Sequence, residues 1–165
     1  MKFLIAVFTA IFAVTVWATE RHSPYTEQSN PEAYCLALNI YWEARGSSLA
    51  DKAAVSDVVL NRVKSNSYPD SVCEVVYDAR VAASGQPLRN QCQFSWFCDG
   101  KSDEPREADA WYEAQVIAYQ IYHNDRFKGI TEGSDHYHST TVDPYWAEGF
   151  DFVAIIGDHI FYRSN

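Results

Sequence analysis

The spacing of apolar residues predicts that most of the chain is helical. Residues 31–45 form the first predicted helix, and one of its faces carries an apolar residue at each turn: Ala33, Leu36, Ile40 and Ala44. Residues 29–32 (Ser-Asn-Pro-Glu) have the form of a capping box, and Gly46 is a natural stop. This helix is therefore bounded at both ends by sequence signals.

Three further helices are expected on the same grounds. Residues 48–51 resemble a second capping box, and the helix after them, to about Lys64, should bury four valines: Val55, Val58, Val59 and Val63. Residues 71–74 begin a short third helix, and a long helix is expected from residue 105 or 106 to Asn124. Residues 78–90 contain Ser-Gly-Gln-Pro and are expected to form a loop.

The pattern becomes strand-like near the C-terminus. Residues 135–139, 152–156 and 159–163 are expected to be extended, with Gly157-Asp158 as a two-residue hairpin turn. The predicted fold class is α+β, with a helical body and a small C-terminal antiparallel sheet. Residues 31–165 are expected to form a single domain after a flexible polar lead-in over residues 19–30.

The first eighteen residues have the pattern of a signal peptide. Lys2 precedes an apolar run over residues 3–16, and residues 16–18 (Val-Trp-Ala) place small side chains where a signal peptidase reads them. We expect cleavage after Ala18, giving an exported protein, periplasmic or secreted, with no membrane span. An uncleaved membrane anchor is the alternative, but a spanning helix needs about 20 apolar residues and this run is shorter.

Charge limits the partners of the chain. The formal net charge is −9, and removal of Lys2 makes the exported protein still more acidic. Nucleic acid is a poor partner for such a protein, because its phosphates require Lys and Arg. An anionic polymer would have to be held by local contacts in a groove. The aromatic content of 15% suits both a core and a sugar-binding groove. We expect the protein to be a monomer.

The chain has four cysteines, and an even number in an exported protein indicates disulfides. Four cysteines allow three pairings. We favour a local Cys92–Cys98 bond and a Cys35–Cys73 bond that ties two helices. A structural zinc site is the alternative, but the chain contains no Cys-x-x-Cys pair.

Glu43 is the most informative candidate for chemistry, because it points along the apolar face of the first helix. Burial disfavours the charged form, so a half-buried glutamate keeps its proton to higher pH, as the acid of a glycosidase must. Asn39 lies one turn earlier and is placed to hydrogen-bond it. An ion pair with Arg62 would produce the same pattern, so the helical wheel alone leaves both interpretations open.

His136-Tyr137-His138 is a second candidate group. Residues two apart on a strand face the same side, so both imidazoles could bind one metal ion, with His159 as a third ligand. This arrangement would support a zinc-dependent amidase or peptidase. His-x-His is a weak signal by itself, and the same histidines could instead be packed or contact a substrate.

Gln93, Phe94 and Ser95 lie between two cysteines, Cys92 and Cys98. A disulfide there would hold a short polar loop in one conformation, which is how binding loops are pre-organised. A purely structural disulfide would give the same sequence, so both interpretations stay open.

Several motifs, in fixed order, resemble the SleB-type cell-wall hydrolases, the family of spore-cortex-lytic enzymes and their relatives. The resemblance spans about Tyr34 to Arg163, and the matching segments are residues 37–46 (ALNIYWEARG), 54–63, 68–69, 72–76, 92–95, 98–100, 137–138, 144–146 and 156–162. One departure is Ser47, because many relatives have an acidic residue directly after Arg-Gly.

The resemblance implies a lysozyme-like fold of the goose-type or lytic-transglycosylase kind. It implies cleavage of peptidoglycan glycan strands between N-acetylmuramic acid and N-acetylglucosamine. Because glycan cleavage by a carboxylic acid needs no metal, we expect no metal or other cofactor. The family's Tyr-x-Glu-Ala-Arg-Gly motif places its catalytic glutamate at Glu43. We expect substrate contacts from Asn39, the loop residues 93–95, Tyr137 and His138.

The type of reaction depends on whether a second carboxylate lies near the acid, because hydrolysis with inversion or retention needs one. Five residues are conceivable and no motif marks any of them: Asp51, Asp78, Asp99, Glu132 and Asp135. A lytic transglycosylase needs only one glutamate, which protonates the leaving oxygen and then takes the proton of the sugar's 6-hydroxyl. We therefore expect 1,6-anhydromuramoyl ends. The alternatives are a metal-dependent wall amidase or peptidase, and a non-catalytic wall-binding module.

Overall fold

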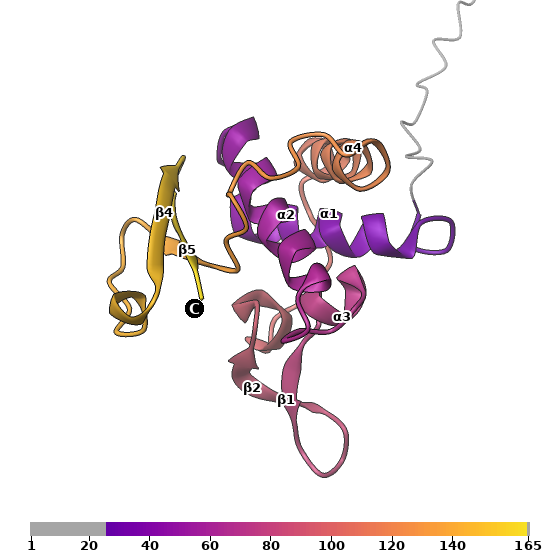
Figure 1. The fold of residues 1–165 in the computed structure, drawn as a ribbon. Helices are drawn as coiled ribbons and strands as arrows, with labels where there is room; N and C mark the ends of the chain where they lie inside the picture. The colour runs from indigo at the N-terminus through magenta and orange to yellow at the C-terminus, as the bar shows by residue number, and fades with distance from the viewer. Residues whose placement is uncertain (1–25, 165) are drawn as a thin grey trace, which may run out of the picture.

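A computed structural model describes residues 26–164, and the predicted signal peptide lies outside them. This part of the chain is α+β, as predicted. Figure 1 shows a helical body with a small sheet on one side. A separate two-stranded hairpin projects from the helical body. None of the helices described is long and apolar enough to cross a membrane.

Helix α1 (Pro31–Ala44) is the centre of the helical body. It packs against α2 (Leu49–Lys64), α3 (Val72–Val76) and α4 (Ala108–Asn124). The predicted apolar face is buried, and further side chains on the other sides of the helix are buried too: Cys35, Ala37, Leu38, Asn39 and Tyr41. Because α1 is enclosed on several sides, the backbone of its last turn, which carries Glu43, is held in a defined position.

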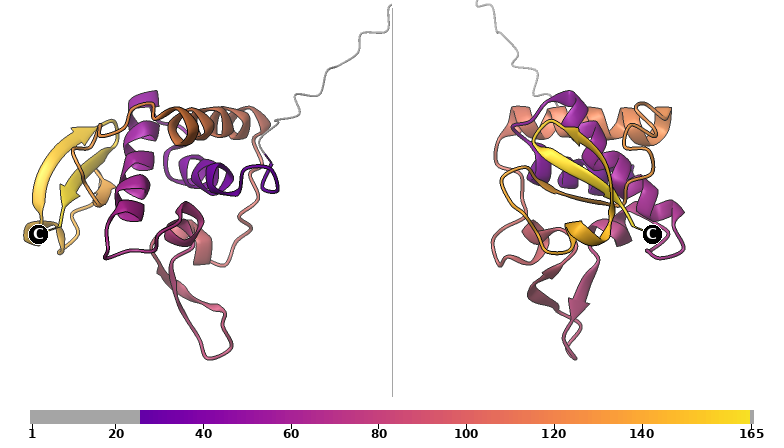
Figure 2. Two further views of the ribbon diagram at one scale, coloured as in Figure 1. Left: turned by 45° about the vertical axis from the view of Figure 1, so that its right-hand side comes forward. Right: turned by 60° about the vertical axis from the view of Figure 1, so that its left-hand side comes forward.

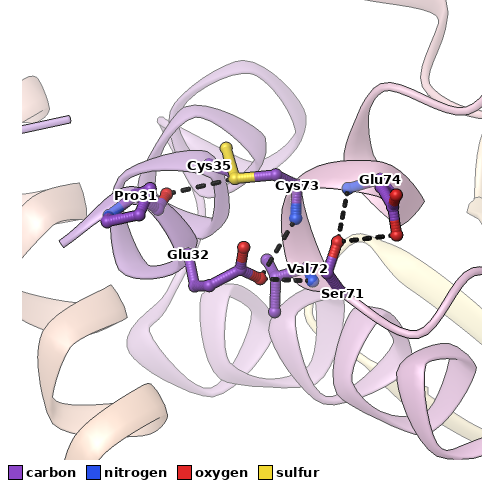
Figure 3. Close-up of a disulfide and its surroundings, with 7 residues drawn as sticks. All are labelled: Pro31, Glu32, Cys35, Ser71, Val72, Cys73 and Glu74. Carbon is purple, nitrogen blue, oxygen red and sulfur yellow. Dashed lines mark hydrogen bonds between the residues drawn. A yellow bond between two sulfur atoms is a disulfide. The ribbon is translucent and has the colours of Figure 1, made fainter. Parts of the chain in front are cut away.

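The start of α1 differs from the expected capping box. Asn30 is the N-cap and makes no side-chain cap, while the Glu32 carboxylate turns to α3. Figure 3 shows Glu32 Oε2 accepting hydrogen bonds from the backbone amides of Val72, at 2.5 Å, and Cys73, at 3.3 Å. Amides at a helix start lack partners within the helix, so an acceptor from a neighbouring helix satisfies them. The disulfide Cys35–Cys73 joins the same two helices, in the pairing favoured from the sequence.

Replacement of Glu32 should therefore destabilise the junction between α1 and α3. Glu32→Ala is expected to lower the free energy of unfolding by about 1–2 kcal/mol, because two partly buried amides lose their acceptor. Glu32→Gln keeps one acceptor oxygen and should recover part of this loss. Urea denaturation of the oxidised protein measures both values. An unfolding curve for Glu32→Ala that matches the parent would show that water satisfies these amides equally well.

Helix α2 begins as predicted but uses its first acidic residue differently. The Ser48 hydroxyl accepts a hydrogen bond from the Asp51 amide at 3.2 Å. The Asp51 carboxylate does not return to Ser48; it is fully buried and faces the turn between the last two strands. Of the four valines expected in the core, Val63 is only partly buried, and the other three are fully buried.

The expected loop over residues 78–90 was wrong, because most of it belongs to a hairpin. Strands β1 (Ala79–Val81) and β2 (Pro87–Cys92) pair antiparallel, and the connection contains Gly85 at φ +81°. Both strands are largely exposed, so no alternation of apolar side chains marks them in the sequence. A 3-10 helix, η1 (Ser95–Cys98), follows, and the second disulfide, Cys92–Cys98, closes this segment.

The C-terminal sheet has the predicted strands and turn. Strands β3 (His136–Ser139), β4 (Asp151–Ile156) and β5 (His159–Arg163) pair antiparallel in the order β3-β5-β4, and η2 (Ala147–Gly149) precedes β4. Ile156 pairs with His159, so Gly157-Asp158 is the whole connection.

A second, smaller apolar core attaches this sheet to the helices. Phe161 of β5 is fully buried against Val55 and Val58 of α2 and Ala44 of α1. Figure 2 shows α2 lying between the sheet and α4. The end of α1 and the inner face of the sheet thus meet beside α2.

Candidate active site

A cleft of about 420 Å³ lies where the last turn of α1 meets η1 and strands β3 and β5. Twelve residues line it: Trp42, Glu43, Arg62, Cys92, Gln93, Phe94, Ser95, Trp96, Tyr137, His138, Ser139 and His159. The expected acid and all the expected substrate-contacting residues are among them except Asn39. The fold therefore gathers into one cleft residues that are far apart in the chain.

Glu43 is half-buried in the wall of this cleft. Burial raises the pKa of its carboxyl group above the ordinary value of 4.5, although the hydrogen bond from Tyr137 and the nearby His159 and Arg62 act to lower it. A carboxyl group with a raised pKa retains its proton closer to neutral pH. The side chain is therefore suited to donate a proton to a bound substrate.

Tyr137 holds the Glu43 carboxylate in place. Its hydroxyl donates a hydrogen bond to Glu43 Oε2 over 3.2 Å. Burial and the neighbouring Glu43 raise the pKa of Tyr137 well above 10.0, so this hydroxyl stays a donor. The Tyr137 ring packs against Phe161, with ring centroids 5.7 Å apart. The second apolar core thereby fixes the group that orients Glu43.

Arg62 does not form the direct ion pair with Glu43 that was considered from the sequence. Its Nε donates a hydrogen bond to the carbonyl oxygen of Asp135 at 2.8 Å, and its guanidinium lies over the rings of Tyr68 and Phe94. It is almost fully buried and acts on Glu43 only through its charge. Glu43 is therefore left free of a strong partner other than Tyr137.

Asn39 does not fulfil the role expected for it. Its side chain is fully buried, and its Oδ1 accepts a hydrogen bond from Trp96 Nε1 at 3.4 Å instead of meeting Glu43. On a helix enclosed on several sides, the residue one turn before Glu43 lies inside the protein rather than in the cleft. Asn39 supports the Trp96 wall and has no exposed surface with which to contact a substrate.

The loop before η1 forms the opposite wall. Gln93 and Ser95 are exposed at the cleft, and the Cys92–Cys98 disulfide closes the segment around them. Phe94 is only 3% exposed and packs under the Arg62 guanidinium, with 5.4 Å between the Arg62 Cζ and the ring centroid. The two polar residues of the loop can reach a ligand, whereas Phe94 mainly anchors the loop.

The comparison with protein families identifies the family of the chain. The model of the cell wall hydrolase family matches residues 46–162, which is more than half of the chain. The chain belongs to the cell wall hydrolase family. The matched region of this hydrolase begins at Gly46, three residues after Glu43. The role of Glu43 therefore depends on the geometry of the cleft and on the motif that contains it.

Two solved structures share the fold of this hydrolase. The catalytic domain of the germination-specific lytic transglycosylase SleB from Bacillus anthracis is 23% identical, with a TM-score of 0.60 over 86% of this chain and 99% of that domain. The catalytic domain of the Bacillus cereus SleB protein is 24% identical, with a TM-score of 0.57 over 81% of this chain and 91% of that one. No curated protein matches the sequence. The predicted fold of a SleB-type catalytic domain is confirmed.

Among residues 26–164, Glu43 is the only carboxylate that lines this hydrolase's cleft. The other candidates from the sequence have different surroundings. Asp135 accepts hydrogen bonds from both Ser164 groups, Asp99 pairs with Lys101 at the surface, and Glu132 is exposed. Asp78 lines a neighbouring cavity. Asp51 reaches the cleft only through His159, with which it pairs.

The proposed metal site does not assemble, because its histidines occupy two faces of the sheet. In the β3–β5 register Ser139 lies opposite His159, so His159 shares a face with Tyr137 and Ser139. His136 and His138 point to the other face, where both contact the Trp146 ring. Residues 26–164 contain no group of three potential ligands that could hold a metal ion. The alternative of a zinc amidase or peptidase thus has no ligand set in this part of the chain.

Two tryptophans of the cleft were not anticipated as site residues. Trp42 and Trp96 stack with ring centroids 6.4 Å apart and planes inclined by 20°. They also line a second cavity of about 360 Å³, which contains Arg45 of the Tyr-x-Glu-Ala-Arg-Gly segment. The sequence did offer a signal for both as site residues, because Trp42 directly precedes Glu43 and Trp96 lies between Cys92 and Cys98. Ser47, at the position where relatives carry an acid, donates to Asp158 at 3.0 Å and lies outside the lining of the cleft.

Proposed function

We propose that this hydrolase cleaves the glycan strand of peptidoglycan between N-acetylmuramic acid and N-acetylglucosamine, with Glu43 as the acid. The observation that carries the proposal is the half-buried Glu43 carboxyl group, which has a raised pKa and a single hydrogen bond from Tyr137 in an open cleft. Such a group can hold its proton until a glycosidic oxygen binds beside it. Membership of the cell wall hydrolase family supports a wall polymer as the substrate.

The cleft also has the parts that a glycan requires. Trp42 and Trp96 offer flat apolar surfaces for sugar rings, while Gln93 and Ser95 offer hydrogen bonds on the opposite wall. Because the protein is acidic, these local contacts must provide the affinity for an anionic wall polymer. Both ring nitrogens of His138 are already hydrogen-bonded, one to the Tyr162 hydroxyl and one to the Ser139 carbonyl oxygen. We therefore assign His138 a supporting role in the wall of the cleft.

We further propose that the products carry 1,6-anhydromuramoyl ends. Glycoside hydrolases canonically use a second carboxylate within about 5–9.5 Å of the acid, and among the described residues that line the cleft Glu43 is the only carboxylate. In a lytic transglycosylase the sugar's own 6-hydroxyl attacks the anomeric carbon, so no water has to be activated. The SleB protein of Bacillus anthracis is named a lytic transglycosylase, which supports the same outcome here.

Mass spectrometry of the muropeptides released from purified peptidoglycan tests both proposals. The expected products lack one water relative to ordinary disaccharide peptides and are not reduced by borohydride. Full-mass, reducible ends would instead identify a hydrolase. New free amino groups would indicate an amidase, and no release at all would indicate a binding module.

The proposed setting is outside the cytoplasm, in the periplasm or the surrounding medium, with the protein acting as a monomer. Two disulfides among residues 26–164 suit an oxidising compartment. A signal peptide cleaved after Ala18 would direct the chain there.

A further inference from the structure

A buried carboxylate and an imidazole form a pair beside Glu43. Asp51 is fully buried at the start of α2, and its Oδ1 lies 2.8 Å from Nδ1 of His159. Its Oδ2 accepts a hydrogen bond from the backbone amide of Asp158 at 3.1 Å. Asp51 therefore holds both the imidazole and the turn before it. His159 in turn lines the same cleft as Glu43.

The bond to Asp51 determines which ring nitrogen of His159 carries the proton. Burial acts to raise the pKa of Asp51, but the hydrogen bonds with His159 and the Asp158 amide outweigh it and the pKa lies below 3.8. An ionised carboxylate only accepts hydrogen bonds, so in the neutral form of the ring Nδ1 is the donor and Nε2 has the free lone pair. Within residues 26–164 no hydrogen bond to Nε2 is present, and His159 lines the cleft.

Four ionisable groups from the surrounding elements face His159. Asp51 comes from α2 and Glu43 from α1, where the nearness of His159 acts to lower the pKa of Glu43. Tyr137 of β3 meets the imidazole edge-on, with ring centroids 5.1 Å apart. Asp158 precedes it in the turn, and its carboxylate accepts a hydrogen bond from Ser47. Within this group, Glu43 and His159 both line the cleft, and each can exchange a proton with a bound ligand, Glu43 through its carboxyl group and His159 through Nε2.

We propose that His159, held by Asp51, accepts the proton of the oxygen that attacks the anomeric carbon. The inference rests on the proposed glycan cleavage. Glu43 gives its proton to the glycosidic oxygen, and the bond from that oxygen to C1 breaks with its electron pair on the oxygen. The attacking oxygen forms the new bond to C1, and its proton passes to Nε2. Asp51 stabilises the imidazolium, which returns the proton through solvent to the Glu43 carboxylate.

This assignment separates the two proton transfers that a single glutamate would otherwise perform in succession. The acceptor chemistry is the same whether the attacking group is the 6-hydroxyl of the sugar or a water molecule. The mass of the new glycan ends distinguishes these two sources. The anhydro mass identifies the 6-hydroxyl, and the full mass identifies water.

His159→Asn is the decisive variant, because the asparagine amide nitrogen takes the place of Nδ1 and nothing replaces Nε2. The hydrogen bond to Asp51 and the turn should survive, so the melting temperature should stay within about 2 °C of the parent. We expect kcat to fall about 100-fold or more, with KM changed less than about threefold. His123→Asn is the matched control, since His123 is exposed on α4. It should retain the parent's kcat.

Asp51→Asn tests the positioning role of Asp51. Its amide oxygen can still accept from the Asp158 amide, while its amide nitrogen now donates to Nδ1 of His159. The ring proton then moves to Nε2, and the lone pair in the cleft is lost. Nitrogen-15 NMR of labelled histidine should show Nδ1–H in the parent and Nε2–H in this variant. The loss of kcat should approach that of His159→Asn.

Either of two results would overturn the proposal. One is a folded His159→Asn protein with kcat within about threefold of the parent. The other is a parent protein whose His159 carries its neutral proton on Nε2, a measurement that needs no variant to fold. Glu43→Gln is assayed alongside. If the parent releases no glycan product, or Glu43→Gln retains activity, then the proposed function fails rather than the role of His159.

Discussion

Glu43→Gln should abolish digestion of purified peptidoglycan, with kcat reduced roughly 10³-fold or more. Glutamine keeps the shape of the side chain and can still accept the hydrogen bond from Tyr137. It cannot deliver a proton to the glycosidic oxygen. Release of soluble muropeptides over time measures the effect. Glu132→Gln makes the same chemical change at an exposed residue outside the cleft and should leave the rate unchanged.

The same variant should not be less stable than the parent at neutral pH. The pKa of Glu43 is raised in the folded protein, so its contribution to stability is fully present below its unfolded pKa and is lost as pH rises through the folded pKa. Glutamine carries no such dependence. In thermal melts, the melting temperature of Glu43→Gln should therefore rise relative to that of the parent as the pH rises. A folded Glu43→Gln protein with substantial activity would remove Glu43 from the mechanism.

Gly157→Ala should be strongly destabilising, although it adds one methyl group to an exposed turn. Gly157 has φ +59°, and a Cβ there would lie 2.6 Å from the Asp51 side chain. Asp51 is fully buried in α2 and cannot move aside. Backbone strain together with this overlap should lower the free energy of unfolding by about 2–4 kcal/mol.

Gly129→Ala is the matched control for this effect. Gly129 has φ +78°, but nothing lies within 4 Å of its added Cβ, so only the backbone strain of about 1 kcal/mol applies. Urea denaturation compares the two variants. Equal losses would mean that the turn moves away from Asp51 without cost. Gly157→Ala should also reduce activity in the folded fraction, because the displaced turn carries His159.

The sequence was most informative where burial is periodic. The faces of α1 and α2 bury apolar residues at helical spacing and β5 alternates buried with less buried residues, and these elements lie where the pattern placed them. The β1–β2 hairpin was missed because its strands are exposed and a disulfide closes the segment after it. Its stability comes from pairing and a covalent bond, and neither has a hydrophobic period.

The site was harder to predict, because it depends on how elements pack against each other. Glu43 could be named from its helix face and motif, but the face of the sheet occupied by His159 depends on strand register. Glu32 and Asp51 both looked like capping residues of their own helices. Each instead bonds to a segment distant in the sequence, Glu32 to α3 and Asp51 to the β4–β5 turn. Local patterns cannot show such partners.

The second apolar core has a consequence for the order in which the chain is made. Phe161 belongs to the last strand, and it packs against the helices and the Tyr137 ring that orients Glu43. A nascent chain that still lacks β5 contains Glu43 but has neither the sheet nor the closed cleft around it. Glu43 is thus among the first residues of the cleft to be synthesised, and the cleft around it can form only after Phe161 has been added. Any activity that needs the closed cleft therefore requires almost the complete chain.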